Sequence, residues 1–360
     1  MLDFSTLLPG PYATLLLAEA GAEVIKIEKA QGGDELRTGV PRWGDDSINF
    51  NLLNAGKRSI ALDLKQTPSR AKLLPLIREA DVLVEQFRPG VMDRLGLGYQ
   101  ELRQINPRLI YCSITGYAAD GPSAKTAGHD LTYMADAGLL SLSCGNGGEP
   151  TLPPVLVADI GGGTMPAVMN ILLALVQRNH TQAGTHIQVS ITDNLFAWPY
   201  ASVQRGMVFG EWPKTGGERL TGGTPRYQIY RAKDGRYIAV AALEDRFWQV
   251  FCDCIELSPR WCDDSKDPKS TQTAVAALIA EKDSGTWRAI FAGKDACASV
   301  VRTLEEAAQD PQFARHFQRG IRRGDREVPS VATPIAPQFR RAELTAAPAL
   351  GADNATLLGP

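Results

Sequence analysis

The sequence predicts an α/β protein with a parallel sheet and a second, smaller domain. In the first third of the chain, short β-branched and apolar runs alternate with helical patterns, which is typical of a parallel sheet flanked by helices. Near residues 211–219 the composition changes to Pro, Gly and Lys, and an alternating hairpin pattern follows. We therefore expect a separate α+β domain there. The length of 360 residues fits about two domains.

Local signals define the elements of the first third. The expected strands are residues 2–4, 22–28, 59–64, 81–87 and 109–115, and the expected helices are residues 12–20, 69–80 and 99–105. Gly21 stops the first helix, Pro75 kinks the second, and Asn106 and Pro107 end the third. No GxGxxG turn follows the first strand, so an ordinary dinucleotide fold is not expected, nor a ribose contact by Glu28.

The middle of the chain combines a carboxylate, a glycine run and an apolar helix. A strand is expected at residues 153–159, glycines follow at 161–163, and a helix is expected at 165–177. This order puts Asp159 near a helix N-terminus, where backbone N–H groups point outward. Close packing of the backbone would explain the glycines equally well. A strand at 185–192 and a helix at 193–208 complete this part.

A hairpin opens the expected second domain. Alternating runs at residues 227–232 and 236–243 are joined by Lys233, Asp234 and Gly235, a sequence typical of a tight turn. Helices are expected at residues 246–254 and 273–292. The tail beyond about residue 320 is rich in Pro and Ala.

Charge and composition exclude several classes of function. The chain has 38 Lys and Arg against 40 Asp and Glu, so no basic excess supports nucleic-acid binding. No apolar run approaches the roughly 20 residues that span a bilayer, and no signal peptide is visible. The six cysteines form no CxxC pair and indicate reduced thiols in the cytoplasm. The four histidines lack the HxxxH spacing of a zinc site.

Three acid–base residues stand out. His129 lies in a loop, Asp159 ends an expected strand, and Glu244 ends the second hairpin strand. Strand ends are where α/β proteins place ligand-contacting side chains. A histidine with a carboxylate opposite it could move a proton to and from one carbon. Taken singly, Asp159 and Glu244 could equally be helix caps, and His129 an ordinary loop residue.

Basic residues recur at the ends of successive expected strands. They are Lys26, Lys29, Lys57, Arg58, Lys65 and Arg88. Because parallel strands end at one edge of a sheet, these side chains could hold a phosphorylated nucleotide. Ordinary solvated surface would explain the same residues.

Eight motifs run in order along nearly the whole chain. They are LPGPYA at 8–13, NAGKRSIALDLK at 54–65, FRPGV at 87–91, NPRLIY at 106–111, AGHDLTY at 127–133, VADIGGG at 157–163, YRAKDGRYIAVAA at 230–242 and DAC at 295–297. Together they resemble the class III CoA-transferase superfamily, and most closely its α-methylacyl-CoA racemase branch. No single motif is specific, but the ordered set is. Ala55 departs from the arginine that many members have in the NRGKRS run, so one phosphate contact is expected to be lost.

The resemblance implies a large Rossmann-like domain, a small domain, and two chains interlocked as a homodimer. Residues 1–200 would form the first part of the large CoA-binding domain and residues 201–219 a linker. Residues 220–310 would form the small domain, and residues 311–360 would return to complete the large one. The implied partner is an acyl-CoA thioester. No metal, separate cofactor, membrane or nucleic acid is implied.

The resemblance also implies the site. The CoA residues would be Lys29, Leu62, Asp63, Leu64, Lys65, Arg88, Gly128, Asp130, Leu131, Thr132 and Tyr133. His129 and Asp159 would be the two racemase bases, and Glu244 a supporting acid contributed by the partner chain. Met134, Ala135 and Met165 are expected near the acyl group.

The expected activity is interconversion of (2R)- and (2S)-2-methylacyl-CoA through an enolate. Burial would have to raise the pKa of Asp159, and the N–H groups of residues 161–164 would stabilise the enolate oxygen. Two alternatives stay open. One is CoA transfer between acids through an Asp159 anhydride and thioester, and the other is a non-catalytic CoA-binding relative. His129 favours the racemase, because transferase relatives usually lack a histidine at that position.

Overall fold

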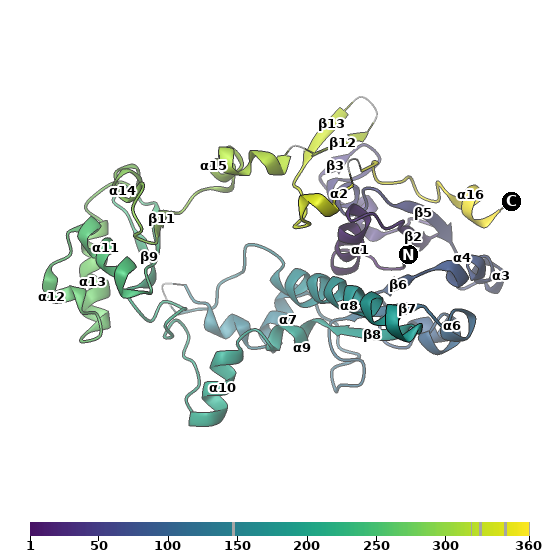
Figure 1. Cartoon of the computed structure of the whole chain (residues 1–360), viewed down its shortest axis with the longest axis horizontal. Helices are drawn as coiled ribbons and strands as arrows, with labels where there is room; N and C mark the ends of the chain where they lie inside the picture. Colours follow the sequence, from purple (N-terminus) through teal and green to yellow (C-terminus); the bar gives the residue numbers. More distant parts are fainter. Residues whose placement is uncertain (146–147, 318, 324–325, 342–343, 360) are drawn as a thin grey trace. The chain divides into compact units, whose positions relative to one another are not determined.

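A computed structural model describes residues 1–145, 148–317, 319–323, 326–341 and 344–359 (Figure 1). The chain divides into two compact units. The first comprises Met1–Ala137, Pro153–Trp198 and Ala314–Pro360, and the second comprises Gly138–Leu152 and Pro199–Phe313. Residues 138–152 and 201–219, which the resemblance assigned to the large domain and to a linker, belong to the second unit.

The first unit is built on a six-stranded sheet in the order β5-β2-β1-β6-β7-β8. The strands are β1 (Leu2–Asp3), β2 (Ile25–Lys29), β5 (Arg58–Leu62), β6 (Val82–Glu85), β7 (Ile110–Thr115) and β8 (Thr185–Ser190). All neighbouring strands run parallel, which confirms the predicted parallel sheet. Lys29 lies beside Leu62 in register, so two residues of the predicted CoA site are neighbours at the carboxyl edge.

Helices cover both faces of this sheet. On one face α1 (Pro9–Glu19) packs on β1 and β6, and α8 (Met165–Thr181) packs on β7 and β8. On the other face α4 (Leu74–Glu79) and α6 (Tyr99–Ile105) pack together over a core that contains the fully buried Leu73, Leu83 and Leu102. Burying one leucine side chain contributes about 2 kcal/mol, so this core holds the helices on the sheet.

Prolines divide two of the expected helices. The helix expected at residues 69–80 is two helices, α3 (Thr67–Ala71) and α4, with Pro75 in the first turn of α4. The helix expected at 193–208 is α9 (Ile191–Phe196) and α10 (Tyr200–Phe209), separated at Pro199. The remaining short elements outside the second unit's core are η1 (Glu35–Thr38), β3 (Arg42–Trp43), β4 (Asp46–Ser47), α2 (Ile48–Leu53), α5 (Val91–Arg94), α7 (Asp130–Asp136), η4 (Pro311–Phe317), β12 (Arg319–Arg323), β13 (Arg326–Ser330), η5 (Pro337–Phe339) and α16 (Asn354–Leu358).

The strand expected at residues 153–159 is wrong. An irregular segment, in which Val155 is 60% exposed, leads into a π-helix, η3 (Ala158–Thr164), that continues directly into α8. A short apolar run does not by itself separate a buried strand from a loop. The glycines provide close packing, since a Cβ atom on Gly162 would lie 2.6 Å from the carbonyl oxygen of Ile191.

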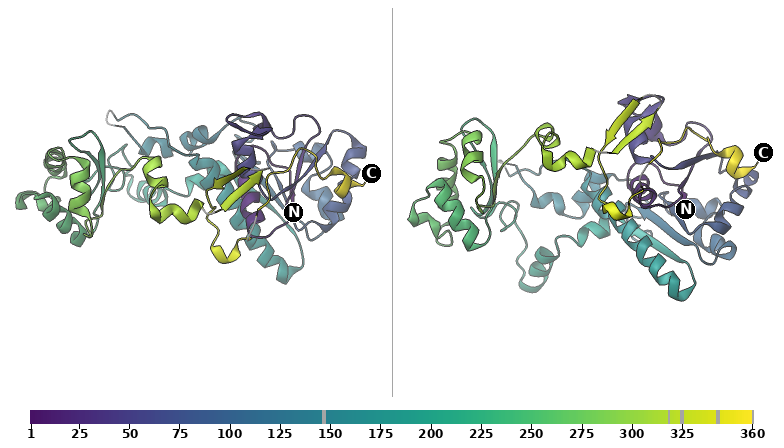
Figure 2. Two further views of the ribbon diagram at one scale, coloured as in Figure 1. Left: turned by 90° about the horizontal axis from the view of Figure 1, so that it is seen from above. Right: turned by 45° about the horizontal axis from the view of Figure 1, so that its top comes forward.

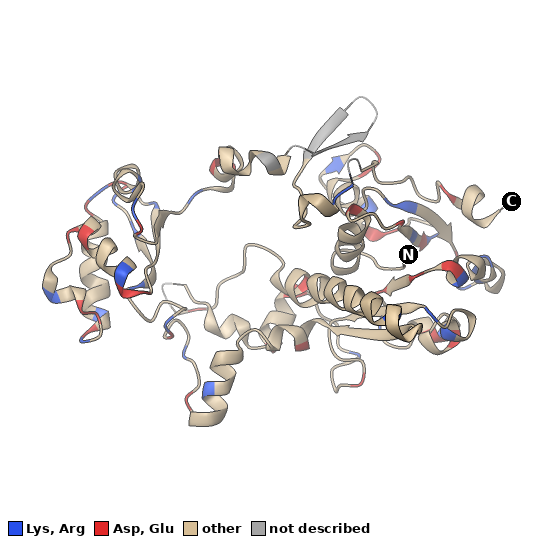
Figure 3. Cartoon of the chain, in the orientation of Figure 1, with Lys and Arg blue, Asp and Glu red and all other residues tan. Residues whose placement is uncertain are grey.

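One helix of the described chain, Ala158–Thr181, is long and apolar enough to cross a membrane by length and composition alone. The sequence had shown no apolar run of that length. Core helices pass the same test, and here α8 packs on the sheet while its largely buried Arg178 forms an ion pair of 2.7 Å with Asp81. Figure 3 shows that α8 is nearly free of charged residues. The sheet therefore covers only part of an apolar helix.

The C-terminal segment runs back beside the first strands (Figure 2). Arg58 Nε donates a hydrogen bond of 2.8 Å to Asp353, whose other oxygen accepts from the Ser59 N–H at 2.9 Å. Helix α16 packs on β5. The tail therefore covers the β5 edge of the sheet.

The second unit contains the predicted hairpin. β9 (Tyr227–Arg231) and β10 (Tyr237–Ala241) pair antiparallel, and β11 (Ala298–Val300) adds a third strand. The unit also contains η2 (Leu139–Leu142), α11 (Asp245–Ile255), α12 (Pro259–Cys262), α13 (Pro268–Ile279), α14 (Ser284–Phe291) and α15 (Leu304–Ala308). Stacked rings of Phe251, Trp287 and Phe291 lie in its core. All six cysteines of the chain are free thiols, as expected.

A buried ion pair links the start of the sheet to α1. The side chains of Lys57 and Asp3 are fully buried, with Lys57 Nζ 3.0 Å from Asp3 Oδ2. The same ammonium donates to the Thr14 hydroxyl at 2.8 Å. Burial alone would raise the pKa of Asp3, but Lys57 and Lys26 outweigh it and hold that pKa well below its ordinary value. Lys57 thus serves the core and not a nucleotide-binding edge.

We expect Lys57→Met to lower the free energy of unfolding by about 3–5 kcal/mol, because it removes the ammonium that directly contacts a buried carboxylate. Urea unfolding followed by circular dichroism measures the change. Lys72→Met, at an exposed position that follows α3, is the matched control and should change the free energy by less than about 0.5 kcal/mol. Equal losses in the two variants would contradict this role of Lys57.

Candidate functional site

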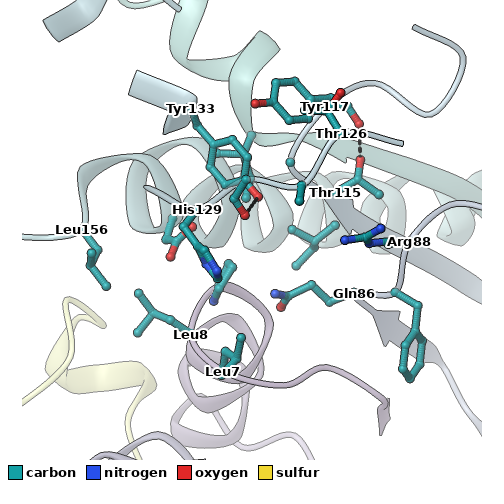
Figure 4. Close-up of a pocket in the computed structure, with 18 of the residues that line it drawn as sticks. Leu7, Leu8, Gln86, Arg88, Thr115, Tyr117, Thr126, His129, Tyr133 and Leu156 are labelled. Carbon is teal, nitrogen blue, oxygen red and sulfur yellow. Dashed lines mark hydrogen bonds between the residues drawn. The ribbon is translucent and has the colours of Figure 1, made fainter. Parts of the chain in front are cut away.

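A cavity of about 770 Å³ lies at the carboxyl edge of the sheet in the first unit. Its wall comes from the loop after β1, the turn after β6, the loop after β7, and the starts of α7 and η3. Figure 4 shows His129, Tyr133, Leu8 and Leu156 around the same hollow, with Gln86 and Arg88 farther along it. An apolar hollow with a few polar side chains at this edge is typical of a ligand site.

His129 is presented to the cavity by the start of α7. Its backbone N–H donates to Thr132 Oγ1 at 3.0 Å, and the Thr132 hydroxyl donates back to the His129 carbonyl oxygen at 2.8 Å. The threonine therefore closes the first turn of the helix. The imidazole is left to line the cavity (Figure 4).

Asp159 lines the same cavity from the first turn of η3. Its backbone N–H donates to Asp130 Oδ2 at 2.8 Å, and Asp130 is buried. Burial, together with the charge of Asp130, raises the pKa of the Asp159 carboxyl to about 6, while His129 opposes the rise. A raised pKa of this carboxyl was expected for a proton donor and is confirmed.

A second cavity, of about 640 Å³, lies over the ends of β2 and β5. Five predicted CoA residues line it, namely Lys29, Leu62, Asp63, Leu64 and Lys65. Lys29 makes only an exposed contact of 3.4 Å with Glu35, which contributes little energy and leaves the ammonium accessible. Phe87 lines both cavities, so they adjoin at this ring.

The other predicted CoA residues divide into two groups. Gly128, Tyr133 and Arg88 line the first cavity. A Cβ atom on Gly128 would lie 2.4 Å from the Tyr133 ring, so this contact requires glycine. Leu131 and Thr132 are exposed and line neither cavity, and the Asp130 side chain lies behind the wall and holds Asp159.

Glu244 belongs to the second unit. It is exposed at the N-cap of α11, and its side chain makes no capping hydrogen bond. Glu244 is not among the residues that line either cavity of the first unit. Its assignment to the site rests on the resemblance.

Two expectations about the site are wrong. Of the N–H groups of residues 161–164 that were expected to stabilise the enolate oxygen, those of residues 162–164 lie inside the continuous helix of η3 and α8, where they bond within the helix and are not free. The residues expected near the acyl group, Met134, Ala135 and Met165, do not line the first cavity. Leucines from the loop after β1 and from the segment before η3 line it instead.

Some residues of the cavity carried no recognised signal. Leu7 has φ 62°, a left-handed conformation that a leucine rarely adopts, and such strain is common at functional sites. Gln86 Oε1 accepts the Gly10 N–H at 3.0 Å, and the Tyr117 hydroxyl donates to Asp136 at 2.6 Å. The LPGPYA motif begins directly after Leu7, and the FRPGV motif begins directly after Gln86. A motif alone, however, does not give the direction of a side chain.

Comparison with known sequences finds two kinds of relative. The profile of CoA-transferase family III matches residues 1–354. Alpha-methylacyl-CoA racemase of Mus musculus is 36% identical over 312 residues, which is 85% of this chain and 77% of the relative. Acetyl-CoA:oxalate CoA-transferase of Acetobacter aceti is 34% identical over 327 residues, which is 87% of this chain and 82% of the relative. These similar identities do not separate the two reactions.

Solved structures share the fold over nearly the full length. Rv3272 from Mycobacterium tuberculosis aligns with a TM-score of 0.85 at 27% identity, covering 99% of this chain and 97% of that chain. A CAIB/BAIF family protein from Brucella suis aligns with a TM-score of 0.83 at 28% identity, covering 99% and 96%. The match therefore includes the sheet, the glycine-rich helix and the small antiparallel unit.

We expect Asp130→Asn to lower the pKa of Asp159 below about 6, because asparagine keeps an acceptor for the Asp159 N–H and removes a neighbouring negative charge. Titration of ¹³C-labelled aspartate carboxyls by NMR measures the pKa, and Asp159→Asn assigns the signal. Asp136→Asn, an exposed aspartate at the other end of α7, should leave it unchanged. An Asp159 pKa that stays near 6 in Asp130→Asn would show that the Asp130 charge is not its cause.

Proposed function

Because this chain belongs to CoA-transferase family III, we propose that it binds an acyl-CoA thioester and interconverts the (2R) and (2S) forms of a 2-methyl-branched acyl group. The observation that supports this choice is that an imidazole, His129, and a carboxyl of raised pKa, Asp159, line one cavity. CoA transfer needs the carboxylate alone. Exchange of configuration at a carbon needs two proton-transferring groups.

The two adjoining cavities suit the two parts of such a substrate. In this proposal the phosphates of CoA lie in the second cavity, near the ammonium groups of Lys29 and Lys65. The pantetheine arm passes Phe87, which borders both cavities. The thioester and the branched acyl group then occupy the first cavity, beside His129 and Asp159.

Racemisation proceeds by two proton transfers. The thioester carbonyl acidifies the α-hydrogen, because the electron pair left on the carbon delocalises onto the oxygen as an enolate. One of His129 and Asp159 removes the proton from one face, and the other donates a proton to the opposite face. Burial raises the pKa of the Asp159 carboxyl to about 6, so this group both releases and takes up a proton near neutral pH. Paired with an imidazole, it serves as acid or base in either direction.

We further propose that the protein is a homodimer, in which Glu244 of one copy supports the His129 imidazole of the other. The helix α8 supports this assembly, since it exposes an apolar face at helical spacing. That face consists of Met169, Leu172, Leu173 and Val176, each 49–60% exposed. A contiguous exposed apolar face marks an interaction surface, and a second copy buries it.

We expect Leu173→Glu to raise the dissociation constant of the dimer at least about tenfold, because it puts a charge into an apolar contact. Sedimentation velocity over a concentration series measures this constant. Leu304→Glu, at an isolated leucine of α15 that is 88% exposed, should leave it unchanged. A wild-type chain that sediments as a monomer at every concentration would contradict the dimer.

CoA transfer is the second candidate, because the transferase of Acetobacter aceti is nearly as similar as the racemase of Mus musculus. In that reaction the Asp159 carboxylate attacks the donor thioester and expels the CoA thiolate, forming an anhydride. The thiolate then attacks the Asp159 carbonyl of the anhydride, which expels the donor acid as a carboxylate and leaves a thioester on Asp159. The acceptor carboxylate attacks this thioester in turn, and the released thiolate attacks the acceptor-derived carbonyl to give the new acyl-CoA and free Asp159. Hydroxylamine cleaves the thioester on Asp159. An adduct formed only with a CoA donor supports transfer.

The deciding experiment is exchange of the α-hydrogen. In deuterated water the enzyme should incorporate one deuterium at C2 of a 2-methylacyl-CoA and equilibrate the two configurations, as followed by ¹H NMR. His129→Gln and Asp159→Asn should each lower the rate at least about a hundredfold, because each removes one of the two proton-transferring groups.

His180→Gln, at an exposed histidine near the end of α8, is the matched control and should keep the full rate. Exchange that survives at the wild-type rate in both site variants would remove the two-base mechanism. Tight CoA binding with no exchange at any acyl chain length would instead support a non-catalytic relative.

A further inference from the structure

A third cavity, of about 310 Å³, shares a wall with the first. The residues Phe87, Arg88 and Pro89 border both, and Phe87 also borders the second cavity. One short turn after β6 therefore touches all three spaces. Behind this turn, the third cavity contains a group of polar side chains that the mechanism above does not use.

Glu85 is the central member of this group. It ends β6, is 6% exposed, and lines the third cavity. One carboxylate oxygen accepts the N–H of Phe87 at 2.8 Å, and Ser113, which lies beside Glu85 in register, lowers the pKa of the carboxyl through its hydroxyl. The carboxylate thus holds the backbone of the turn directly. Burial raises the pKa of Glu85 to about 7, with Asp93 adding to the rise and the Ser113 and Phe87 donors opposing it.

Two neighbouring strands orient this carboxylate. Ser113 on β7 lies beside Glu85 in register, and its Oγ lies 3.0 Å from Nε2 of His186 on β8. Burial lowers the pKa of His186, so its imidazole is neutral near pH 7. A proton on Nε2 donates to the serine oxygen, which leaves the serine hydroxyl to donate to Glu85. The ring is fixed by Tyr99, which stacks on it with centroids 5.0 Å apart.

The turn held by Glu85 also contacts α1. Gln86 Oε1 accepts the Gly10 N–H at 3.0 Å, and a Cβ atom on Gly10 would lie 2.9 Å from that oxygen. Loss of the hydrogen bond between Glu85 and Phe87 would therefore free the turn after β6. Phe87 of this turn borders the first and the second cavity, and its neighbours Gln86 and Arg88 line the first cavity.

We propose that Glu85 is a positioning residue, whose ionised carboxylate, oriented by Ser113 and His186, holds the Gln86–Arg88 turn in the arrangement that binds CoA. This inference rests on the proposed acyl-CoA substrate. An ionised acceptor binds an N–H about twice as strongly as a neutral one, so protonation of Glu85 weakens the hold on the turn. CoA then binds more weakly below the pKa of this carboxyl than above it.

Other titratable and polar groups lie around Glu85, because they line the same cavity or interact with its charge. They are Asp93 of α5, Arg88 of the turn, Tyr99 of α6, Tyr111, Cys112 and Ser113 of β7, and His186 and Gln188 of β8. Among these residues, Asp93 is acidic and Arg88 is basic, so their charges act on Glu85 in opposite directions. Burial raises the pKa of Tyr111 and of Cys112 far above neutrality, so neither titrates with Glu85.

The test is calorimetric binding of free coenzyme A to the full-length protein at about pH 6 and about pH 8. Glu85→Gln keeps the side-chain shape and one acceptor but loses the charge. We expect it to bind CoA about fivefold more weakly than wild type at the higher pH, with the ratio falling towards one at the lower pH, where wild-type Glu85 is protonated. Titration of CoA itself affects both proteins alike and cancels in the ratio.

Two further variants separate positioning from folding. Ser113→Ala removes a hydroxyl that lowers the Glu85 pKa, so Glu85 becomes protonated at a higher pH in this variant. The pH at which CoA affinity falls should therefore be higher in Ser113→Ala than in the wild type. Glu79→Gln, at an exposed position on α4, should bind as wild type at both pH values. In the α-hydrogen exchange assay, Glu85→Gln should raise KM and leave kcat within about twofold.

The outcomes distinguish this inference from the proposed function. A ratio between wild type and Glu85→Gln that is the same at both pH values, or equal to one at the higher pH, would overturn the role of Glu85. CoA binding with the expected ratio but without α-hydrogen exchange would remove the racemase and leave this role intact. A wild-type protein that binds no CoA would overturn both.

Discussion

The relation between the two acid–base groups depends on one hydrogen bond, from the N–H of Asp159 to Asp130 Oδ2 at 2.8 Å. Asp130 directly follows His129 in α7, and Asp159 lies in the first turn of η3, so this bond joins two helix starts. A carboxylate at a helix N-terminus is stabilised by the free N–H groups there. The same charge helps to raise the Asp159 pKa. One buried carboxylate therefore holds Asp159 in place and, together with burial, raises its pKa.

Packing around α1 brings these helix starts to the edge of the sheet. The Thr164 hydroxyl donates to the Pro9 carbonyl oxygen at 2.8 Å, which joins η3 to the first residue of α1. The Lys57 ammonium, just before β5, pairs with Asp3 of β1 and donates to the Pro11 carbonyl oxygen and the Thr14 hydroxyl of α1, so α1 is anchored to the first strand. The absence of a side chain on Gly162 allows η3 to approach α9. These contacts connect the core around α1 with η3, the helix that presents Asp159 to the cavity.

The sequence predicted the parts of the structure that follow local rules. Alternating apolar runs identified the parallel strands, and the resemblance identified His129 and Asp159 as members of one site. The start of η3 was missed, since the apolar residues before it suggest a strand although Val155 is exposed. The apolar wall at Leu7 was missed because its left-handed backbone is set by tertiary contacts. Glu85 was missed because its neighbours depend on the register of three strands.

The chemistry of Asp159 alone suits either reaction. With a pKa of about 6 the carboxyl is roughly 90% ionised at pH 7, as a nucleophile requires, and it still offers a proton in the remaining fraction. The distinction lies at the N-cap of α7. Ser, Thr, Asp and Asn stabilise that position best, because their side chains accept a helix N–H. Here the position holds His129, and Thr132 closes the turn with its own hydroxyl. The imidazole at this position lines the cavity, which suits the proton transfer proposed above.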